Sequence, residues 1–167
     1  MSFYFFWGHT PKVAGVVDRS CLSQWFPAAF SVDGVSYRTA EHWMMAEKAR
    51  LFGDLAALAR ILEAKTPAEA KALGRKVTPF DASRWEKARF EVVVRGSVAK
   101  FSAHPELKAF LLATGDAVLV EASPRDRVWG IGMGASNPDA QDQSKWRGRN
   151  LLGFALVEAR KVLLTAT

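Results

Sequence analysis

The clearest pattern of hydrophobic and polar positions lies in residues 39–53. Ala, Met, Glu and Lys, which favour helices, dominate this stretch, and Thr39 is of a residue type that caps helix N-termini. At helical spacing, one face carries Glu41, Met44, Met45, Lys48 and Phe52. The Met and Phe side chains predict that this face points inward, although it also bears a carboxylate and an amine. Charges on an apolar face are costly unless they are paired or placed in a cleft.

Two interpretations of these charges are open from the spacing alone. Glu41 and Lys48 are two helical turns apart, roughly 10 Å along the axis, so a small polar substrate fits between them. In the other interpretation, Glu41 only complements the helix dipole from the first turn. Lys48 then extends its charged end into water over an apolar surface.

The remaining patterns predict a helical chain with a few short strands. Asp33-Gly34 separates two short β-prone runs and indicates a hairpin over residues 30–37. Gly53 ends the helix that begins at Thr39. Other strands are expected at 3–6 and 118–121, and other helices at 54–64, 66–73, 81–101, 104–112 and 151–164. We therefore predict an α+β, mostly helical single domain over residues 1–167, with about six helices, a few short strands and an N-terminal β-hairpin. The number of strands is too low for a doubly wound sheet.

Composition limits the classes of protein and of site. A chain of 167 residues with 49% hydrophobic residues can build a core of its own. Its one cysteine, Cys21, excludes an internal disulfide framework, and its three scattered histidines offer no zinc-binding spacing. We therefore predict neither a metal nor a cofactor. The absence of a basic signal-peptide start, and of apolar runs near the roughly 20 residues of a membrane span, predicts a cytoplasmic protein with no membrane partner.

The net charge is +6, from 23 Lys and Arg against 17 Asp and Glu, which would favour phosphate, ADP-ribose or nucleic acid as a partner. The basic residues are spread along the chain, with modest groups only at 71–76 and 147–149. Solubility alone is the other explanation of this charge. The sequence does not indicate an oligomeric state.

Aromatic and glycine residues supply further candidate chemistry. The chain has six Trp, and three Gly follow Trp129 at alternate positions, where the backbone can approach a ligand closely. This is no dinucleotide fingerprint because it lacks a βαβ context. Trp85 lies off the main apolar stripe of its helix, where it either packs or lines a cleft. With a carboxylate and a lysine, such residues suit a flat base and a sugar phosphate, and Arg75, Arg149 or a helix N-terminus could hold the phosphate.

Several blocks of the chain follow one another in the order of a known family. The blocks are 22–27 (LSQWFP), 37–49 (YRTAEHWMMAEKA), 74–77 (GRKV), Trp85, 100–101 (KF), 111–115 (LLATG), 120–124 (VEASP), Asp126 with 129–132 (WGIG), and 146–153 (WRGRNLLG). In this combination the chain resembles the NADAR, or YbiA-like, family of N-glycosidases over nearly its whole length.

The resemblance implies cleavage of the bond between a ribose C1′ and a nitrogen. Two substrate classes are associated with the family: ribosylaminopyrimidine phosphate intermediates of riboflavin biosynthesis, and ADP-ribosylated guanine in a nucleotide or nucleic acid. The key Glu and Lys of the family match Glu41 and Lys48, and its two pocket tryptophans match Trp85 and Trp129. Asp126 matches an acidic residue before the Trp-Gly motif, whereas Ile131 stands where some members have an acid.

The resemblance also implies a mechanism and a set of substrate-binding residues. We expect Glu41 to act as an acid or base, and Lys48 to attack C1′ and form a Schiff base, with direct activation of water by Glu41 as the alternative. A non-catalytic module that binds ADP-ribose or a nucleotide is the alternative from another class. The predicted substrate-binding residues are Trp85, Trp129, Asp126, Gly130, Arg75, Arg149, Asn150 and Ser23.

Overall fold

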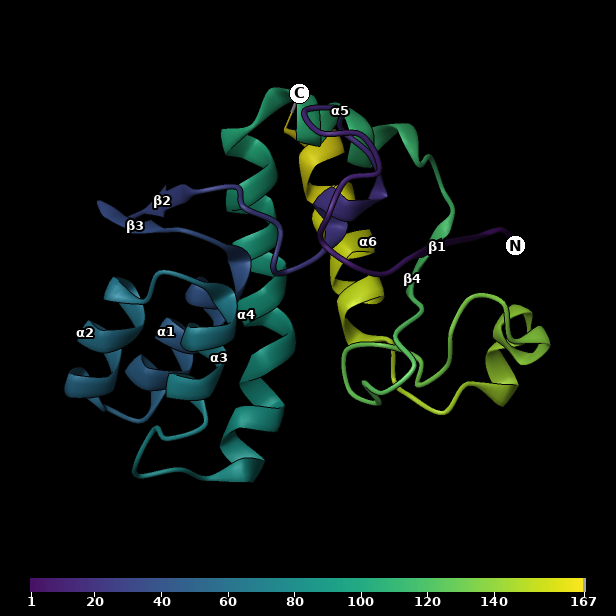
Figure 1. The fold of residues 1–167 in the computed structure, drawn as a ribbon. Coiled ribbons are helices and arrows are strands. Elements are labelled where there is room, and N and C mark those ends of the chain that lie inside the picture. The colour runs from purple at the N-terminus through teal and green to yellow at the C-terminus, as the bar shows by residue number, and fades with distance from the viewer. Residues whose placement is uncertain (167) are drawn as a thin grey trace. The chain divides into compact units, whose positions relative to one another are not determined.

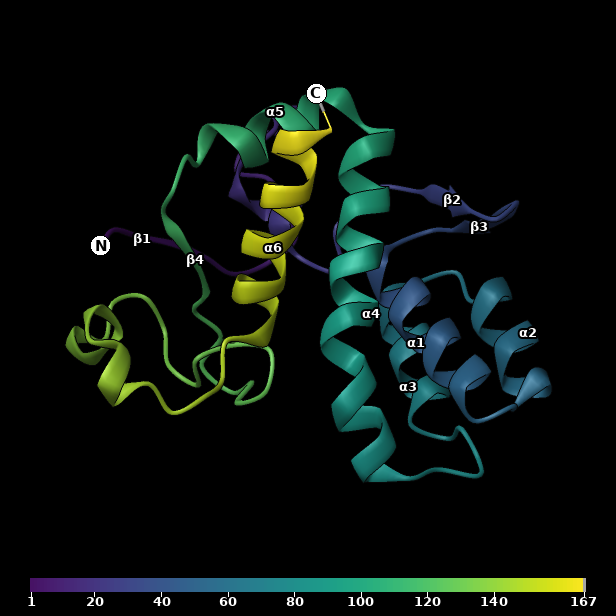
Figure 2. The same cartoon turned by 180° about the vertical axis from the view of Figure 1, so that it is seen from behind.

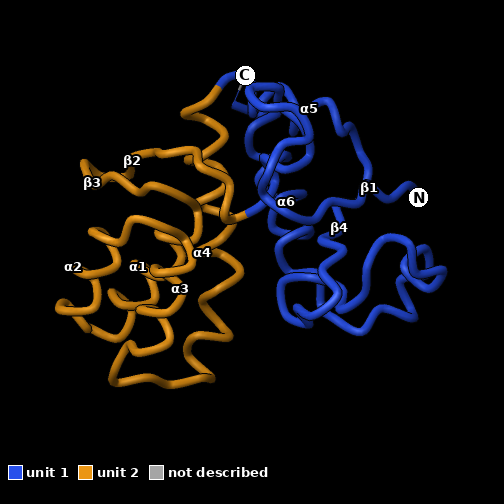
Figure 3. Tube along the Cα trace, in the orientation of Figure 1, with its two compact units in different colours: residues 1–23, 105–167 blue, residues 24–104 orange. Residues whose placement is uncertain are grey.

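The computed structural model describes residues 1–166. Their contacts divide the chain into two compact units, coloured separately in Figure 3. Unit 2 is the continuous stretch Gln24–His104, whereas unit 1 combines Met1–Ser23 with the part of the chain that begins at Pro105. The prediction of one domain over residues 1–167 stays a prediction.

Unit 2 begins with the hairpin that Asp33-Gly34 predicts. Strand β2 (Phe30–Val32) pairs antiparallel with β3 (Val35–Tyr37). Asp33 and Gly34 have φ angles of 51° and 80°, so both turn residues adopt the left-handed conformation of a tight hairpin turn. The hairpin leads into the first helix within a few residues.

Four helices complete unit 2, and Figure 1 shows the three shorter ones grouped beside the long one. They are α1 (Ala40–Leu51), α2 (Leu55–Glu63), α3 (Pro67–Gly74) and α4 (Ala82–Ala103). At the start of each, a side-chain oxygen accepts a hydrogen bond from a backbone N–H of the first turn; the capping residues are Thr39, Asp54, Thr66 and Asp81. These caps are the reason why the sequence predicts the helix starts closely.

Helix α1 is buried on more sides than its sequence indicates. Every residue from Ala40 to Ala46 is buried, because α2, α3 and α4 all pack against this helix, as Figures 1 and 2 show from opposite sides. The prediction of one inward stripe was therefore too narrow. Small residues permit the close packing: a methyl group at Gly74 would overlap the Met45 side chain, and one at Gly96 would overlap Trp43.

A small parallel sheet joins the two chain segments of unit 1. Strand β1 (Phe3–Phe6) pairs with β4 (Val118–Glu121), with Phe3 opposite Val118. Helix α5 (Pro105–Ala113) packs against α6 (Leu151–Thr165), and α6 also packs against β4. Three short 3₁₀ segments complete the unit: η1 (Arg19–Leu22), η2 (Pro138–Gln141) and η3 (Gln143–Lys145).

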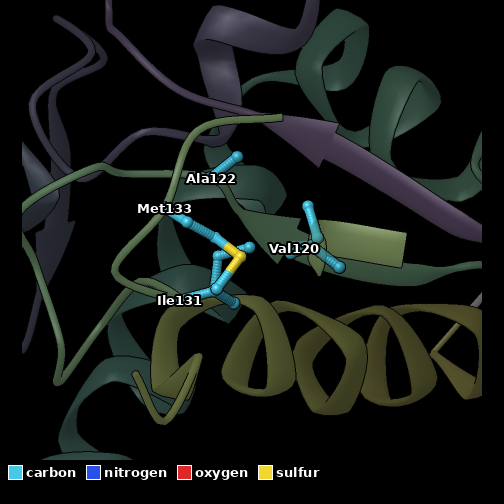
Figure 4. Packing of buried hydrophobic residues seen from close by; sticks show 5 residues of the cluster. Val120, Ala122, Ile131 and Met133 are labelled. Carbon is cyan, nitrogen blue, oxygen red and sulfur yellow. The ribbon is translucent and has the colours of Figure 1, made fainter. Parts of the chain in front are cut away.

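A hydrophobic cluster between β4 and the following loop forms part of the core of unit 1. Val120, Ala122, Ile131 and Met133, labelled in Figure 4, belong to this cluster, and Ala140 completes it. Ile131 is fully buried here, which shows the structural use of this position.

The structure confirms the predicted fold class. Residues 1–166 form six α-helices and a few short strands, in an α+β arrangement that is mostly helical. Within this described part, no helix combines the length and the apolar character needed to cross a membrane.

Candidate functional site

The N-terminus of α1 holds Glu41 in a buried position. Its side chain is in the first helical turn, and the residue is 4% exposed. The Glu41 backbone N–H donates a hydrogen bond of 3.0 Å to the carbonyl oxygen of Gln24. The capping oxygen of Thr39 accepts from the backbone N–H of His42 at 3.3 Å. The start of the helix is therefore fixed by its own cap and by the preceding segment of unit 2.

His42 reinforces this helix start and is a structural residue. Its Nε2 lies 2.9 Å from the carbonyl oxygen of Ala64, which can only accept, so Nε2 carries the proton. Its Nδ1 then accepts from the hydroxyl of Thr39, at 2.7 Å. Burial lowers the pKa of His42 below its ordinary 6.5, which keeps the ring neutral.

Lys48 lies two turns further along α1, beside aromatic rings. Its Nζ is 4.7 Å from the centre of the Phe80 ring and 6.0 Å from that of Trp85. Burial lowers the pKa of Lys48 below 10.5, the Glu41 carboxylate opposes this shift, and the Arg75 guanidinium adds to it. The amine therefore interacts electrostatically with both Glu41 and Arg75.

Two aromatic residues beside Lys48 are held by different segments. Trp85, in the first turn of α4, is 8% exposed and thus mostly buried. Phe80 lies just before α4 and packs edge-on against Phe52, at 5.2 Å between ring centres. The preceding segment is anchored because Thr78 N–H donates to the Asp54 carboxylate at 2.9 Å, the same carboxylate that caps α2.

Four of the predicted site residues therefore come together in unit 2. Glu41 supplies a carboxyl group, and Lys48 supplies an amine whose pKa is lowered. Trp85 supplies an aromatic ring beside that amine, and Arg75 supplies a positive charge from the end of α3. Such a set can transfer protons and can present an amine as a nucleophile. The other predicted residues belong to unit 1; they are Ser23, Asp126, Trp129, Gly130, Arg149 and Asn150.

In unit 1, Asp126 fixes the backbone at Trp129. Its Oδ1 accepts hydrogen bonds from the backbone N–H groups of Val128, at 2.9 Å, and Trp129, at 2.8 Å. The carboxylate therefore acts directly on the loop, as in an Asx turn. Trp129 itself is half-buried.

The glycine-rich segment and Asn150 both lie against β4. A methyl group at Gly130 would lie 2.9 Å from the backbone oxygen of Glu121, so the close approach is to the protein's own strand. Asn150 is fully buried: its Nδ2 donates to Leu119 O at 2.9 Å, and its Oδ1 accepts from Glu121 N–H at 2.9 Å. These contacts give Asn150 a structural role on β4.

The exposed Arg149 and the half-buried Ser23 enter the hydrogen-bond network through their backbones. Arg149 N–H donates to Arg127 O at 2.9 Å, and Ser23 N–H donates to Ser20 O at 3.1 Å. Substrate binding by their side chains stays a prediction. Within residues 1–166, no group of three or more His, Cys, Asp or Glu side chains is placed to hold a metal ion.

Comparison with known proteins identifies the family. The family model described as the NADAR domain matches residues 5–164. The chain belongs to the NADAR family. It is similar to N-glycosidase R617 of Acanthamoeba polyphaga mimivirus, with 41% identity over 95% of each chain. It is 34% identical to N-glycosidase YbiA of Escherichia coli K12, over 87% of this chain and 81% of that protein.

A solved structure extends the match to the fold. The NMR structure of E. coli YbiA aligns with a TM-score of 0.79 and 29% identity, over 99% of this chain and 86% of that one. The NADAR fold therefore accounts for both units of the chain.

Sequence reasoning missed two residues that contact the candidate site. Phe80, whose ring is nearer to Lys48 than the Trp85 ring, comes from a segment without a periodic pattern. Gln24 contacts the helix start through its backbone carbonyl, a group that every residue carries. No signal in the sequence marks either contact.

Proposed function

We propose that this protein is an N-glycosidase that hydrolyses the bond between a ribose C1′ and the nitrogen of a base or amine. The observation that carries the proposal is Lys48, an amine whose pKa is lowered by burial and which interacts with Glu41 on the same helix. The relative named N-glycosidase R617, at 41% identity, supports the same class of reaction.

The proposed reaction begins with opening of the ribose ring. Glu41, in its protonated form, donates a proton to the ring oxygen O4′ as the C1′–O4′ bond breaks. The lone pair of the substrate nitrogen forms a C1′=N double bond at the same time. General acid–base assistance of this kind contributes about 10²–10⁴-fold to the rate.

Lys48 then replaces the substrate nitrogen. Its neutral Nζ adds to C1′, the added proton moves to the departing nitrogen, and the C1′–N bond to the base breaks. The sugar remains bound to Lys48 as a Schiff base. Water adds to this imine, and collapse of the adduct releases the ribose aldehyde and the free amine. The net reaction consumes one water and yields the sugar and the base.

The lowered pKa of Lys48 fits this role because only the neutral amine is nucleophilic. The alternative is that Glu41, as a carboxylate, activates water for direct attack on C1′. The two versions differ in one observable, because only the first forms a covalent bond to Lys48.

The proposed substrates are a ribosylaminopyrimidine phosphate of riboflavin biosynthesis or an ADP-ribosylated guanine, free or in nucleic acid. Both present a ribose with a nitrogen at C1′, and both carry phosphate. The net charge of +6 favours anionic substrates in general. We propose that Trp85 and Trp129 bind through ring contacts, and that Arg75 and Arg149 bind phosphate.

Release of free base from both substrate types tests the proposal. Wild-type protein should release base from at least one of them, whereas Glu41→Gln and Lys48→Met should lose at least about 100-fold in kcat. Borohydride added during turnover should attach the sugar to Lys48. Lys87→Met and Glu86→Gln, at exposed positions of α4, are matched controls that should retain activity.

Each other outcome is informative. Full activity of Lys48→Met would exclude the Schiff base. Tight ADP-ribose binding without base release from either substrate would exclude the enzyme and favour a binding module.

A further inference from the structure

One buried polar atom of unit 2 contributes no hydrogen bond to the fold. The side-chain nitrogen Nε2 of Gln24 is buried and has no hydrogen-bond partner within residues 1–166. An amide donor that is buried without a hydrogen-bond partner destabilises a folded protein. A bound molecule that accepts its hydrogen bond would remove this cost.

The backbone of Gln24 contacts the backbone of Glu41, the buried carboxylate residue of the site. Its backbone carbonyl accepts the hydrogen bond from Glu41 N–H at 3.0 Å, at the first turn of α1. Residues far apart in sequence are thus adjacent in space. The unpartnered amide therefore belongs to a residue that touches the helix turn bearing Glu41.

The segment that carries Gln24 is held on both sides within unit 2. The Lys71 Nζ of α3 lies 5.9 Å from the Trp25 ring centre, and the Lys100 Nζ of α4 lies 5.7 Å from that of Phe26. Contacts of this kind fix a loop without using the amide of Gln24. The donor is consequently presented by an ordered segment, which reduces the entropy lost on binding.

We propose that Gln24 is a substrate-binding residue whose Nε2 donates a hydrogen bond to a hydroxyl of the substrate ribose. The inference rests on the proposed function, since that function brings a ribose to Glu41. A primary amide is a neutral donor, so it suits a neutral hydroxyl oxygen. Gln24 would thereby orient the sugar for the proton transfer of Glu41, and it distinguishes a sugar from an apolar molecule of similar size.

The test separates binding from folding. Gln24→Met removes the amide and keeps a flexible side chain of similar length. Because the amide makes no hydrogen bond through Nε2 in the free protein, the variant should unfold at the same temperature as wild type or higher. Its affinity for ribose 5-phosphate and for ADP-ribose, measured by calorimetry, should fall about tenfold, the factor that one neutral hydrogen bond supplies.

A matched control is Gln143→Met, at an exposed position of unit 1, which should change neither quantity. Wild-type affinity of Gln24→Met for both ligands would overturn the inference. Loss of thermal stability parallel to the loss of affinity would also overturn it, because Gln24 would then serve the fold.

Calorimetry with these ligands does not depend on turnover. If wild type binds ribose 5-phosphate but releases no base, the proposed function fails while the role of Gln24 in binding sugar is still measured. If wild type binds neither ligand, the inference about Gln24 fails as well.

Discussion

The indole of Trp43 lies against the bare backbone of Gly96 and donates a hydrogen bond of 2.8 Å to the carbonyl oxygen of Val92. This contact joins the helix of Glu41 and Lys48 to α4, which bears Trp85. It uses a glycine in the middle of a helix, where glycine is otherwise unfavourable. The relative placement of the site residues within unit 2 therefore depends on a residue without a side chain.

The first prediction concerns this contact. Gly96→Ala should gain about 0.5–1 kcal/mol of helix propensity. It should lose more through overlap of the new methyl group with Trp43, because overpacking costs about 1–3 kcal/mol. We expect net destabilisation, measured by urea unfolding. Ser102→Ala, at an exposed position of α4, should change stability little; a more stable Gly96→Ala would show that Trp43 can move away.

The second prediction concerns pH and stability. The pKa of His42 is lower in the folded protein than its ordinary 6.5, so the unfolded state binds more protons below that pH. The contribution of neutral His42 to the free energy of unfolding is therefore complete above about pH 6.5. It decreases as the pH falls from there toward the pKa of His42 in the folded protein. Urea unfolding from pH 8 to 5 should show this loss.

His42→Gln should be less stable than wild type at pH 8, with a smaller loss of stability on acidification. His9→Gln, at an exposed position, should lose as much stability between pH 8 and 5 as wild type does. If stability changes with pH in His42→Gln as it does in wild type, other groups cause the acid sensitivity.

The third prediction concerns pH and activity. In the Schiff-base mechanism, Glu41 must be protonated and Lys48 must be neutral, so kcat/KM has a bell-shaped dependence on pH, and the midpoint of the limb that belongs to Lys48 lies below 10.5. Arg75→Gln removes a positive charge that disfavours the ammonium form, so the midpoint should move to higher pH. Since Arg75 is exposed, the shift should be small and should shrink at high salt.

Lys76→Gln, at the exposed neighbouring position, should leave the midpoint closer to that of wild type. A higher KM for Arg75→Gln with no change in midpoint would instead assign Arg75 to phosphate binding alone.

The fourth prediction concerns the Trp129 loop. Asp126→Ala removes the acceptor of two backbone hydrogen bonds, so it should cost about 1–2 kcal/mol of stability and raise KM by displacing Trp129. Asp126→Asn keeps an oxygen acceptor and should behave more like wild type. A normal KM in a destabilised Asp126→Ala would show that Trp129 does not contact the substrate.

The sequence predicted the elements whose ends are set by local chemistry. Thr39 and Thr66-Pro67 mark helix starts through side-chain and proline effects of the same turn, and Asp33-Gly34 marks the hairpin. The electrostatic relation between Glu41 and Lys48 also follows from helical spacing, because both lie on one helix.

Contacts between distant segments were not predicted. The pairing of β1 with β4 depends on how the chain closes, and nothing in the run from Phe3 to Phe6 specifies that partner. The position of Phe80 depends on the bond between Thr78 and Asp54, and that of Gln24 on a backbone carbonyl. Such contacts arise from packing, which no local pattern encodes.

The parallel pairing of β1 with β4 has a consequence for the order of events during synthesis. Unit 2 is one continuous stretch that ends at His104, so all of its contacts can form once that residue has left the ribosome. β1 is made first, yet it gains its strand partner only after Val118–Glu121 has been translated. The helix that carries Glu41 and Lys48 can therefore pack within unit 2 before β1 pairs with β4.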